Sequence, residues 1–216
     1  MLQFYRFTEH LLEVNVHTNL TAIREPVGII DKHYIDSLLA IELIPVGARV
    51  LDLGCGPGFP SIPLAIMRPD LEITALDSTS KKIDFVQKSA EILQLSNLKG
   101  VSGRAEDTKL RKSLGKYDIV VSRAVARLNV LCELCIPYLK VGGSLVALKG
   151  AKYDEELAEA TNAIKILGAE TLKIEQKELI TTENQAETRG MIVIQAKKEA
   201  PPQYPRAYAA ILKKPL

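Results

Sequence analysis

The feature that most constrains the fold of this chain is a glycine-rich segment that follows a short apolar run. Residues 50–53 are apolar except for Asp52, as expected of a buried strand with a carboxylate near its end. Three glycines follow at alternate positions, Gly54, Gly56 and Gly58. Glycine adopts positive φ values at little cost and lets the backbone approach a ligand closely. Residues 60–67 then predict a short helix.

A strand, a glycine turn and the start of a helix favour a nucleotide-type cofactor site at the carboxyl end of the strand. A dinucleotide-binding fingerprint needs a small residue at position 59, where this chain has Phe59. The form Asp-x-Gly-x-Gly-x-Gly instead resembles motif I of the methyltransferases that depend on S-adenosylmethionine (SAM). A tight strand-to-helix turn that binds no ligand is the alternative interpretation.

Length and composition favour one α/β domain with an appendage. The chain has 216 residues, of which 47% are hydrophobic and 25% are charged, as in ordinary globular proteins. It has no apolar stretch near the roughly 20 residues that a membrane span requires, and its start lacks a signal-peptide pattern. We therefore expect a cytoplasmic protein that does not contact membranes. The net charge of +2 neither indicates nor excludes a nucleic-acid partner.

The cysteines do not predict a metal site. Cys132 and Cys135 have the spacing of metal ligands, but the chain has no second such pair. Both fall in an apolar pattern of helical period, which favours thiols packed in the core over zinc ligands. Cys55 lies within the glycine turn.

Strand and helix patterns alternate along the middle of the chain. Five strands are expected in parallel, at 49–53, 72–77, 98–102, 117–121 and 144–149. Helices are expected between them and after the last one, over 60–67, about 80–93, 128–139 and 153–167. The glycines of residues 142–143 are expected to cap the end of the helix over 128–139. Two final strands, near 172–178 and 191–196, have only a loop between them and should pair antiparallel. These elements predict a doubly wound, Rossmann-like sheet of seven strands.

Three parts of the chain differ in character. Residues 1–46 predict a helical N-terminal extension, with helices over about 2–16 and 26–43. Residues 47–198 hold the alternating elements and form the predicted cofactor domain. Residues 199–216 form a tail with prolines and basic residues, which we expect to be extended.

In open α/β sheets the ligand lies outside the carboxyl ends of the strands, so the residues there predict the site. Backbone N–H groups of the glycine turn are expected to meet the methionine carboxylate of SAM. Asp77 follows the glycines by about twenty residues, the interval expected of a carboxylate that binds ribose hydroxyls. Ala105 and Glu106 lie where adenine contacts are expected, and the next two strands end at Arg123 and Lys149. The alternatives are that Asp77 caps a helix and that Glu106 is a solvated acid.

The end of the fourth strand also restricts the reaction. Enzymes that methylate adenine amines commonly have Asn or Asp, Pro, Pro and an aromatic residue there, whereas this chain has residues 122–125, Ser-Arg-Ala-Val. Methylation at C5 of a pyrimidine needs a thiolate in a Pro-Cys context, which is also missing. An acceptor atom with a free lone pair remains, and guanine N7 is such an atom. Its methylation needs no general base and depends mainly on positioning, and Arg and Lys suit guanine O6 and phosphate.

Taken together, the motifs resemble those of the small-subunit ribosomal RNA guanine-N7 methyltransferases, also called glucose-inhibited division protein B. The resemblance rests on residues 19–22, 33–37, 52–60, 76–78, 121–124, 148–150, Arg189 and 204–206. It implies a class I SAM-dependent methyltransferase that methylates N7 of one guanine in 16S ribosomal RNA. The substrate would be this RNA or a small-subunit ribosomal particle, and the protein is expected to be a monomer.

The resemblance also assigns residues by position. SAM would be bound by Gly54, Gly56, Gly58, Phe59, Asp77, Ser78, Thr79, Ala105, Glu106 and Arg123. Arg123 and Lys149 are predicted to be catalytic, and His33, Lys149 and Arg189 to bind the substrate; for His33, a helix-surface or capping histidine is the alternative. Two other functions stay open, a SAM-dependent methyltransferase for a small molecule or protein and a non-catalytic module that binds another nucleotide.

Overall fold

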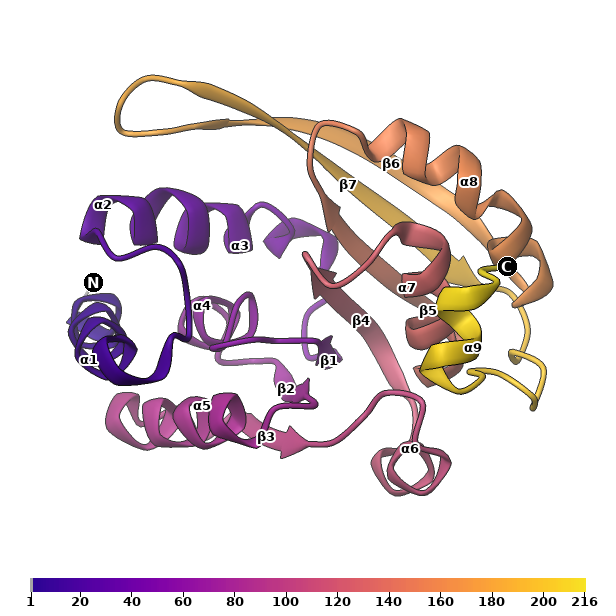
Figure 1. Ribbon diagram of the computed structural model, residues 1–216, viewed down its shortest axis with the longest axis horizontal. Coiled ribbons are helices and arrows are strands. Elements are labelled where there is room, and N and C mark those ends of the chain that lie inside the picture. The colour runs from indigo at the N-terminus through magenta and orange to yellow at the C-terminus, as the bar shows by residue number, and fades with distance from the viewer. Residues whose placement is uncertain (1) are drawn as a thin grey trace.

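The structure is a computed structural model that describes residues 2–216. One sheet of seven strands runs through the molecule in the order β3-β2-β1-β4-β5-β7-β6 (Figure 1). Its strands are β1 Arg49–Leu53, β2 Glu72–Asp77, β3 Leu98–Ser102, β4 Tyr117–Arg123, β5 Leu139–Lys149, β6 Ala169–Ile180 and β7 Ala186–Ala196. The first five pair in parallel, and β7 is antiparallel to both β5 and β6. The predicted fold, with its terminal antiparallel hairpin, is confirmed.

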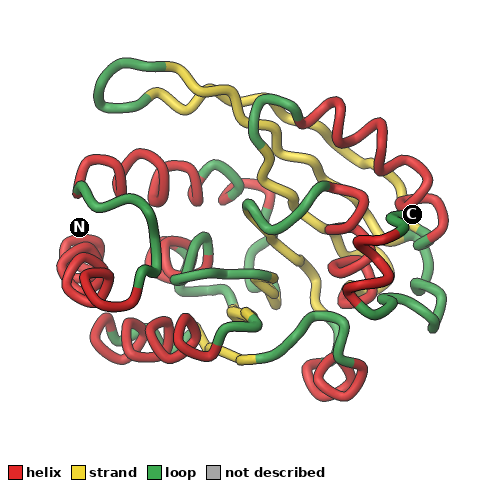
Figure 2. Tube along the Cα trace, in the orientation of Figure 1, coloured by secondary structure: helices red, strands yellow, loops and turns green. Residues whose placement is uncertain are grey.

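Helices cover both faces of the sheet (Figure 2). Their bounds are α1 Leu2–Thr18, α2 Pro26–Ile29, η1 Ile30–Ile35, α3 Asp36–Leu38, η2 Ile41–Leu43, α4 Ser61–Met67, α5 Ser80–Leu93, α6 Thr108–Leu114, α7 Leu128–Cys135, η3 Ile136–Tyr138, α8 Tyr153–Ile166 and α9 Tyr208–Lys213. Side chains of α1, α4 and α5 share one core with one face of the sheet, and those of α7, α8 and α9 share a second core with the other face. None of the helices in residues 2–216 is both long and apolar enough to cross a membrane.

The N-terminal segment packs directly on the first of these cores. Phe7 and Leu11 of α1 are fully buried there. The helix predicted over 26–43 is in fact broken into α2, η1, α3 and η2, and η1 is a turn of π-helix. Single π-helical turns inside helices are frequent at functional sites. Here the π-helix contains His33.

The hairpin of β6 and β7 is longer than the sequence predicted and reaches back to the N-terminal segment (Figure 1). Asp31 fixes the tip of this hairpin. Its Oδ2 accepts hydrogen bonds from the backbone N–H and the hydroxyl of Thr182, at 3.0 and 2.9 Å. Lys177 of β6 donates to the carbonyl of Leu39 at 2.8 Å. The hairpin therefore holds η1 and α3 against the rest of the molecule.

Two local predictions were wrong, and one helix was missed. The tail is not wholly extended, because α9 forms at residues 208–213 and buries Ile211 in the second core. Residues 142–143 do not cap a helix: α7 ends at Cys135, and both glycines lie in β5. The short helix α6 was not predicted at all. By contrast, Cys132 and Cys135 are fully buried thiols of the second core, as expected.

Candidate functional site

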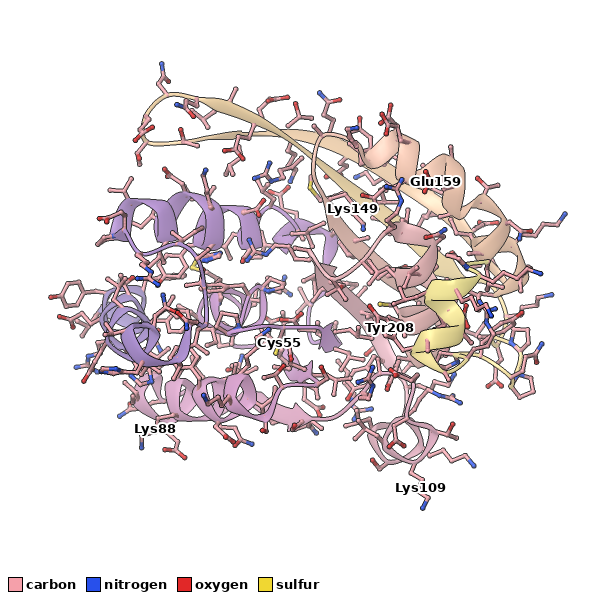
Figure 3. All side chains as sticks on the ribbon, in the orientation of Figure 1. Cys55, Lys88, Lys109, Lys149, Glu159 and Tyr208 are labelled. Carbon is pink, nitrogen blue, oxygen red and sulfur yellow. The ribbon has the colours of Figure 1, made fainter. Side chains whose placement is uncertain are left out.

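A cavity of about 450 Å³ opens at the carboxyl ends of β1 to β4. Loops after all four strands contribute to its wall, together with Thr21 and His33 from the N-terminal segment and Tyr208 from α9. Figure 3 labels Cys55 in the glycine turn and Tyr208 on α9, two parts of the wall that are far apart in the sequence. The predicted residues that line this cavity are His33, Gly54, Gly56, Phe59, Asp77, Ser78, Thr79, Ala105, Glu106 and Arg123. The volume lies within the range of small-molecule sites.

The glycine turn is shaped by close packing. Gly54 has a φ of +77°, and a Cβ built on it would lie 2.3 Å from Cγ2 of Val125. Gly58, with a φ of +99°, is equally tight against Ile62, 2.4 Å from such a Cβ. Gly58 does not line the cavity, and its place in the turn is set by packing against Ile62. Only a residue without a side chain allows the turn at both positions.

The backbone N–H groups of this turn are already bonded inside the protein. Those of Gly54 and Cys55 donate to the carbonyl of Leu76, at 2.7 and 3.1 Å, and those of residues 58 and 59 donate to the carbonyl of Cys55. The N–H of Gly56 donates to Oδ2 of Asp77 at 3.0 Å. Residue 57 is a proline and has no N–H. A methionine carboxylate at this turn would therefore compete with acceptors inside the protein.

Asp52, which precedes the glycine turn in the sequence, is fully buried and stabilises this turn. Its Oδ2 accepts a bond from the backbone N–H of Ser61 at 2.9 Å, at the start of α4. Burial raises the pKa of the Asp52 carboxyl to about 7. Because Asp52 does not line the cavity, its role is to hold strand β1 to helix α4.

Asp77 and Glu106 lie in the wall with part of their hydrogen-bonding capacity in use. The Asp77 carboxylate accepts from the N–H of Gly56 and, at 2.9 Å, from that of Thr79, and it is 9% exposed. Glu106 pairs with Arg104 at 2.7 Å. The alternative interpretations therefore hold in part, since Asp77 fixes the turn before α5 and Glu106 has a basic neighbour. Each carboxylate has lone pairs left for a ligand.

Arg123 connects the sheet to the N-terminal segment. Its Nη1 donates to the carbonyl of Lys32 at 2.7 Å and to Oδ2 of Asp36 at 2.9 Å. Its Nη2 lies 3.0 Å from Nδ1 of His33. The guanidinium also lies 5.6 Å from the centre of the Phe59 ring, within the range of a cation–π interaction.

His33 lies flat on Phe59, with ring centres 4.2 Å apart and planes 15° from parallel. Burial, and then the charge of Arg123, lowers the pKa of His33 to about 4, so the ring is neutral at pH 7. Since a guanidinium only donates, Nδ1 must accept, and the ring proton is on Nε2. Nε2 lies 2.9 Å from the hydroxyl oxygen of Thr21. His33 is thus a cavity residue and not a capping residue.

A second cavity, of about 510 Å³, adjoins the first and shares Arg123, Ala124 and Val125 with it. Ala124 has a φ of +55°, an uncommon value for a residue with a side chain that is often found at functional sites. The second cavity also contains Arg189, whose Nε donates to Oδ1 of Asp36 at 2.8 Å. Asp36 therefore lies between Arg123, which lines both cavities, and Arg189, which lines the second.

Lys149 is present in the second cavity but is not free to act there. It is 7% exposed, and its Nζ donates to the carbonyl of Ala126 at 2.5 Å and pairs with Glu156 at 2.8 Å. The same carboxylate oxygen of Glu156, Oε2, also accepts a hydrogen bond from the N–H of Leu128 at the start of α7, at 2.8 Å. Lys149 and Glu156 together hold the loop after β4 to α7 and α8. In Figure 3 Lys149 lies close to α7 and well apart from Cys55.

Sequence reasoning missed some residues of the site. Thr21 and Asp36 fall in motifs that carried the family resemblance, but neither was assigned a role. Lys82 and Tyr208 also line the first cavity. No sequence signal places Tyr208 there, because it follows the last strand and belongs to a helix too short to give a pattern.

Comparison with known proteins identifies relatives over almost the whole chain. Residues 1–184 match the model of the family described as rRNA small subunit methyltransferase G. A protein of this name from Brevibacillus brevis is 44% identical over 99% of this chain and 90% of its own length. Proteins of the same name from Desulforamulus reducens and Streptococcus pneumoniae are 41% and 44% identical, over 100% and 99% of this chain and 90% of each relative.

Solved structures show the same architecture at low identity. An O-methyltransferase from Bacillus cereus in complex with SAH has a TM-score of 0.58 and 15% identity, over 88% of this chain and 91% of that chain. TYW2 from M. jannaschii in complex with AdoMet has a TM-score of 0.59 and 15% identity, over 76% of each chain. Such a likeness shows the fold alone, and the fold is that of the class I SAM-dependent methyltransferases.

Proposed function

Because the chain belongs to the rRNA small subunit methyltransferase G family, we propose that it transfers a methyl group from SAM to N7 of a guanine in 16S ribosomal RNA. Methylation of small-subunit ribosomal RNA with SAM as methyl donor is the activity of the family. The acceptor base, the acceptor atom and the roles of individual residues are the proposal.

The first cavity fits SAM in its donor groups as well as in volume. We assign the ribose to Asp77, with Ser78 and Thr79 beside it, and the adenine to residues 105–106. The support is that Asp77 retains acceptor lone pairs at the end of β2 and that Glu106 lies next along the wall. The methionine part would then lie toward Gly54, Phe59 and Arg123, where the two cavities meet.

The second cavity is the proposed place of the acceptor base, because it shares Arg123, Ala124 and Val125 with the first. Arg189 is the proposed contact for the base or its phosphate. Three of its five N–H groups have acceptors within residues 2–216, which leaves two that can donate to a ligand. We no longer assign Lys149 to catalysis or to RNA, because its ammonium group is buried against Glu156. It is a positioning residue for the loop after β4.

The observation that carries the choice of N7 is the state of the groups between the cavities. Both oxygens of Asp36 accept from arginines, and Nδ1 of His33 faces the guanidinium of Arg123. Glu156 is paired with Lys149. A side chain engaged in this way is a poor proton acceptor. The arrangement favours an acceptor atom that has a lone pair and no proton to lose, as guanine N7 does.

SAM supplies an electrophilic methyl group on sulfur when it is bound. Transfer of this methyl to the N7 lone pair would need no proton transfer and would depend on how the chain positions the two partners. In the proposed mechanism this chain positions the two reactants: the packed glycine turn and Phe59 hold SAM, and the loop after β4 holds the acceptor base. Arg123 lies beside both partners and holds no mobile proton.

The proposed substrate is 16S ribosomal RNA, alone or within a small-subunit particle, which places the protein in the cytoplasm. We propose that it acts as a monomer. A SAM-dependent methyltransferase for a small molecule or a protein is the alternative, since the fold alone does not fix the substrate.

The decisive experiment is methyl transfer from labelled SAM to small-subunit ribosomal RNA from a strain that lacks the enzyme. The RNA is digested and its nucleosides are separated. We expect a single labelled nucleoside, 7-methylguanosine. Label in another nucleoside would refute the choice of N7, and label in a metabolite or protein but not in RNA would favour the alternative.

A further inference from the structure

The structure leaves the carboxylate of SAM without the donors that the sequence predicted. The N–H groups of residues 54, 55, 56, 58 and 59 all have acceptors inside the protein. A ligand carboxylate carries a full negative charge and needs other donors if it is to leave water. Such donors must lie at the end of the cavity away from Asp77 and residues 105–106.

Thr21 lies at that end and is held rigidly. Its backbone N–H donates to Oδ1 of Asn15 at 3.0 Å, and its carbonyl accepts from Nδ2 of Asn15 at 2.9 Å. Asn15 itself is 3% exposed. The hydroxyl oxygen of Thr21 accepts from the N–H of Ile23 at 3.1 Å and lies in the wall of the first cavity.

The hydrogen bonds around Thr21 determine whether its hydroxyl proton has an acceptor in the protein. Arg123 only donates, so Nδ1 of His33 accepts, and Nε2–H of His33 donates to Thr21. The oxygen of Thr21 therefore accepts two bonds, from His33 and from Ile23. Within residues 2–216 the proton of this hydroxyl has no protein acceptor and is left for a ligand.

Arg123 has donors in reserve at the same place. Two N–H groups on Nη1 and one on Nη2 have acceptors, which leaves one N–H on Nη2 and the one on Nε. The side chain of Arg123 is 15% exposed and lines the first cavity. A carboxylate that accepted from both residues would have charge-assisted bonds on each oxygen.

We propose that the Thr21 hydroxyl and the remaining N–H groups of Arg123 bind the carboxylate of SAM. The hydrogen-bonded series Thr21–His33–Arg123 fixes the direction of each donor before the ligand enters. This inference rests on the placement of adenosine proposed above and not on the identity of the methyl acceptor. Its test is a binding measurement, so its failure is distinct from a failure to form 7-methylguanosine.

The test compares SAM with decarboxylated SAM, which keeps the adenosine, the sulfonium and the amino group. Isothermal titration calorimetry gives the Kd of each for the wild type and for Thr21→Val. We expect Thr21→Val to weaken SAM binding about ten- to a hundredfold, as for a lost hydrogen bond to a charged group. The Kd of decarboxylated SAM should stay within about twofold of the wild-type value. Thr21→Ser, which keeps the hydroxyl, should bind SAM like the wild type.

Thr18→Val is the matched control, because the hydroxyl of Thr18 donates only to the carbonyl of Val14 in its own helix, at 2.7 Å. It should leave both Kd values unchanged. Equal weakening of both ligands by Thr21→Val would show that Thr21 only supports the fold and would overturn the proposal. Unchanged SAM binding in that variant would overturn it too.

A measurement on the wild type keeps the proposal testable if Thr21→Val does not fold. Nitrogen-15 NMR of the His33 ring should show a neutral imidazole with its proton on Nε2. Saturating SAM should shift the Nε2–H resonance through Thr21, and saturating decarboxylated SAM should not. A proton on Nδ1, or the same shift with both ligands, would contradict the series of bonds.

Discussion

Replacement of Arg206 by alanine tests whether the tail is part of the folded structure. Glu133 of α7 is 0% exposed, and Arg206 neutralises it with bonds from Nε to Oε1 at 2.8 Å and from Nη2 to Oε2 at 2.5 Å. The backbone N–H of Arg206 adds a third bond, at 2.9 Å. Arg206→Ala would leave a buried carboxylate without its cation.

Loss of one partner of a buried pair costs about 3–5 kcal/mol. Because the side chain of Arg206 is 27% exposed, water can reach Glu133 when it is removed, and we expect the lower end, about 3 kcal/mol. For a chain of this size that corresponds to a fall in Tm of about 6–12 °C. SAM binding should also weaken, because Tyr208 lies two residues further on and lines the first cavity.

The assay is urea and thermal unfolding at pH 7, with calorimetry of SAM binding. Arg127→Ala is the control, since its pair with Glu159 is exposed on both sides and is expected to be worth less than about 1 kcal/mol. The double variant Glu133→Gln with Arg206→Ala removes the buried charge and should be more stable than Arg206→Ala alone. A loss below about 1 kcal/mol in Arg206→Ala, or a double variant that is no more stable than it, would refute this reasoning.

Three further predictions concern the first cavity and its support. Arg123→Ala should abolish methyl transfer to ribosomal RNA while circular dichroism shows a folded protein, and retained transfer would contradict the role of Arg123. Gly54→Ala should destabilise the protein by about 1–3 kcal/mol in urea unfolding and weaken SAM binding, because its Cβ would meet Val125 at a φ of +77°. Burial raises the pKa of Asp52 to about 7, so the folded state binds a proton more tightly than the unfolded state, and wild-type stability from this group falls as pH rises from about 4 to 7. Asp52→Asn keeps an acceptor for the N–H of Ser61 and should lose this pH dependence, as urea unfolding at pH 5 and pH 8 would show.

The sheet could be predicted because its signals are local. A glycine turn, apolar runs of strand length and helices with regular spacing fix the alternation of elements, and the alternation fixes which strand ends meet. Most of the predicted cofactor residues therefore line one cavity. The sequence locates the end of each strand, and the parallel topology of the sheet brings these ends together at one edge.

The different environments of the Arg123 and Lys149 side chains could not be predicted in the same way. Both are basic residues at the ends of neighbouring parallel strands. Arg123 meets Asp36 from the N-terminal segment and keeps N–H groups free, whereas Lys149 meets Glu156 from α8 and is buried. The difference depends on which acid each cation reaches across the fold, and no spacing in the sequence contains that information.

The N-terminal segment contributes directly to the candidate site. The sheet supplies Arg123, but the acceptors that fix its guanidinium, the carbonyl of Lys32, the ring of His33 and the carboxylate of Asp36, all come from η1 and α3. In the proposed binding mode, the carboxylate of SAM contacts Thr21, which the N-terminal segment provides, and Arg123, which that segment positions. A ligand that binds across two packed segments stabilises their association by the free energy of its contacts to both. On this proposal we expect binding of SAM to be coupled to the packing of residues 2–46 on the sheet, so that substitutions in that packing lower SAM affinity without touching the cavity.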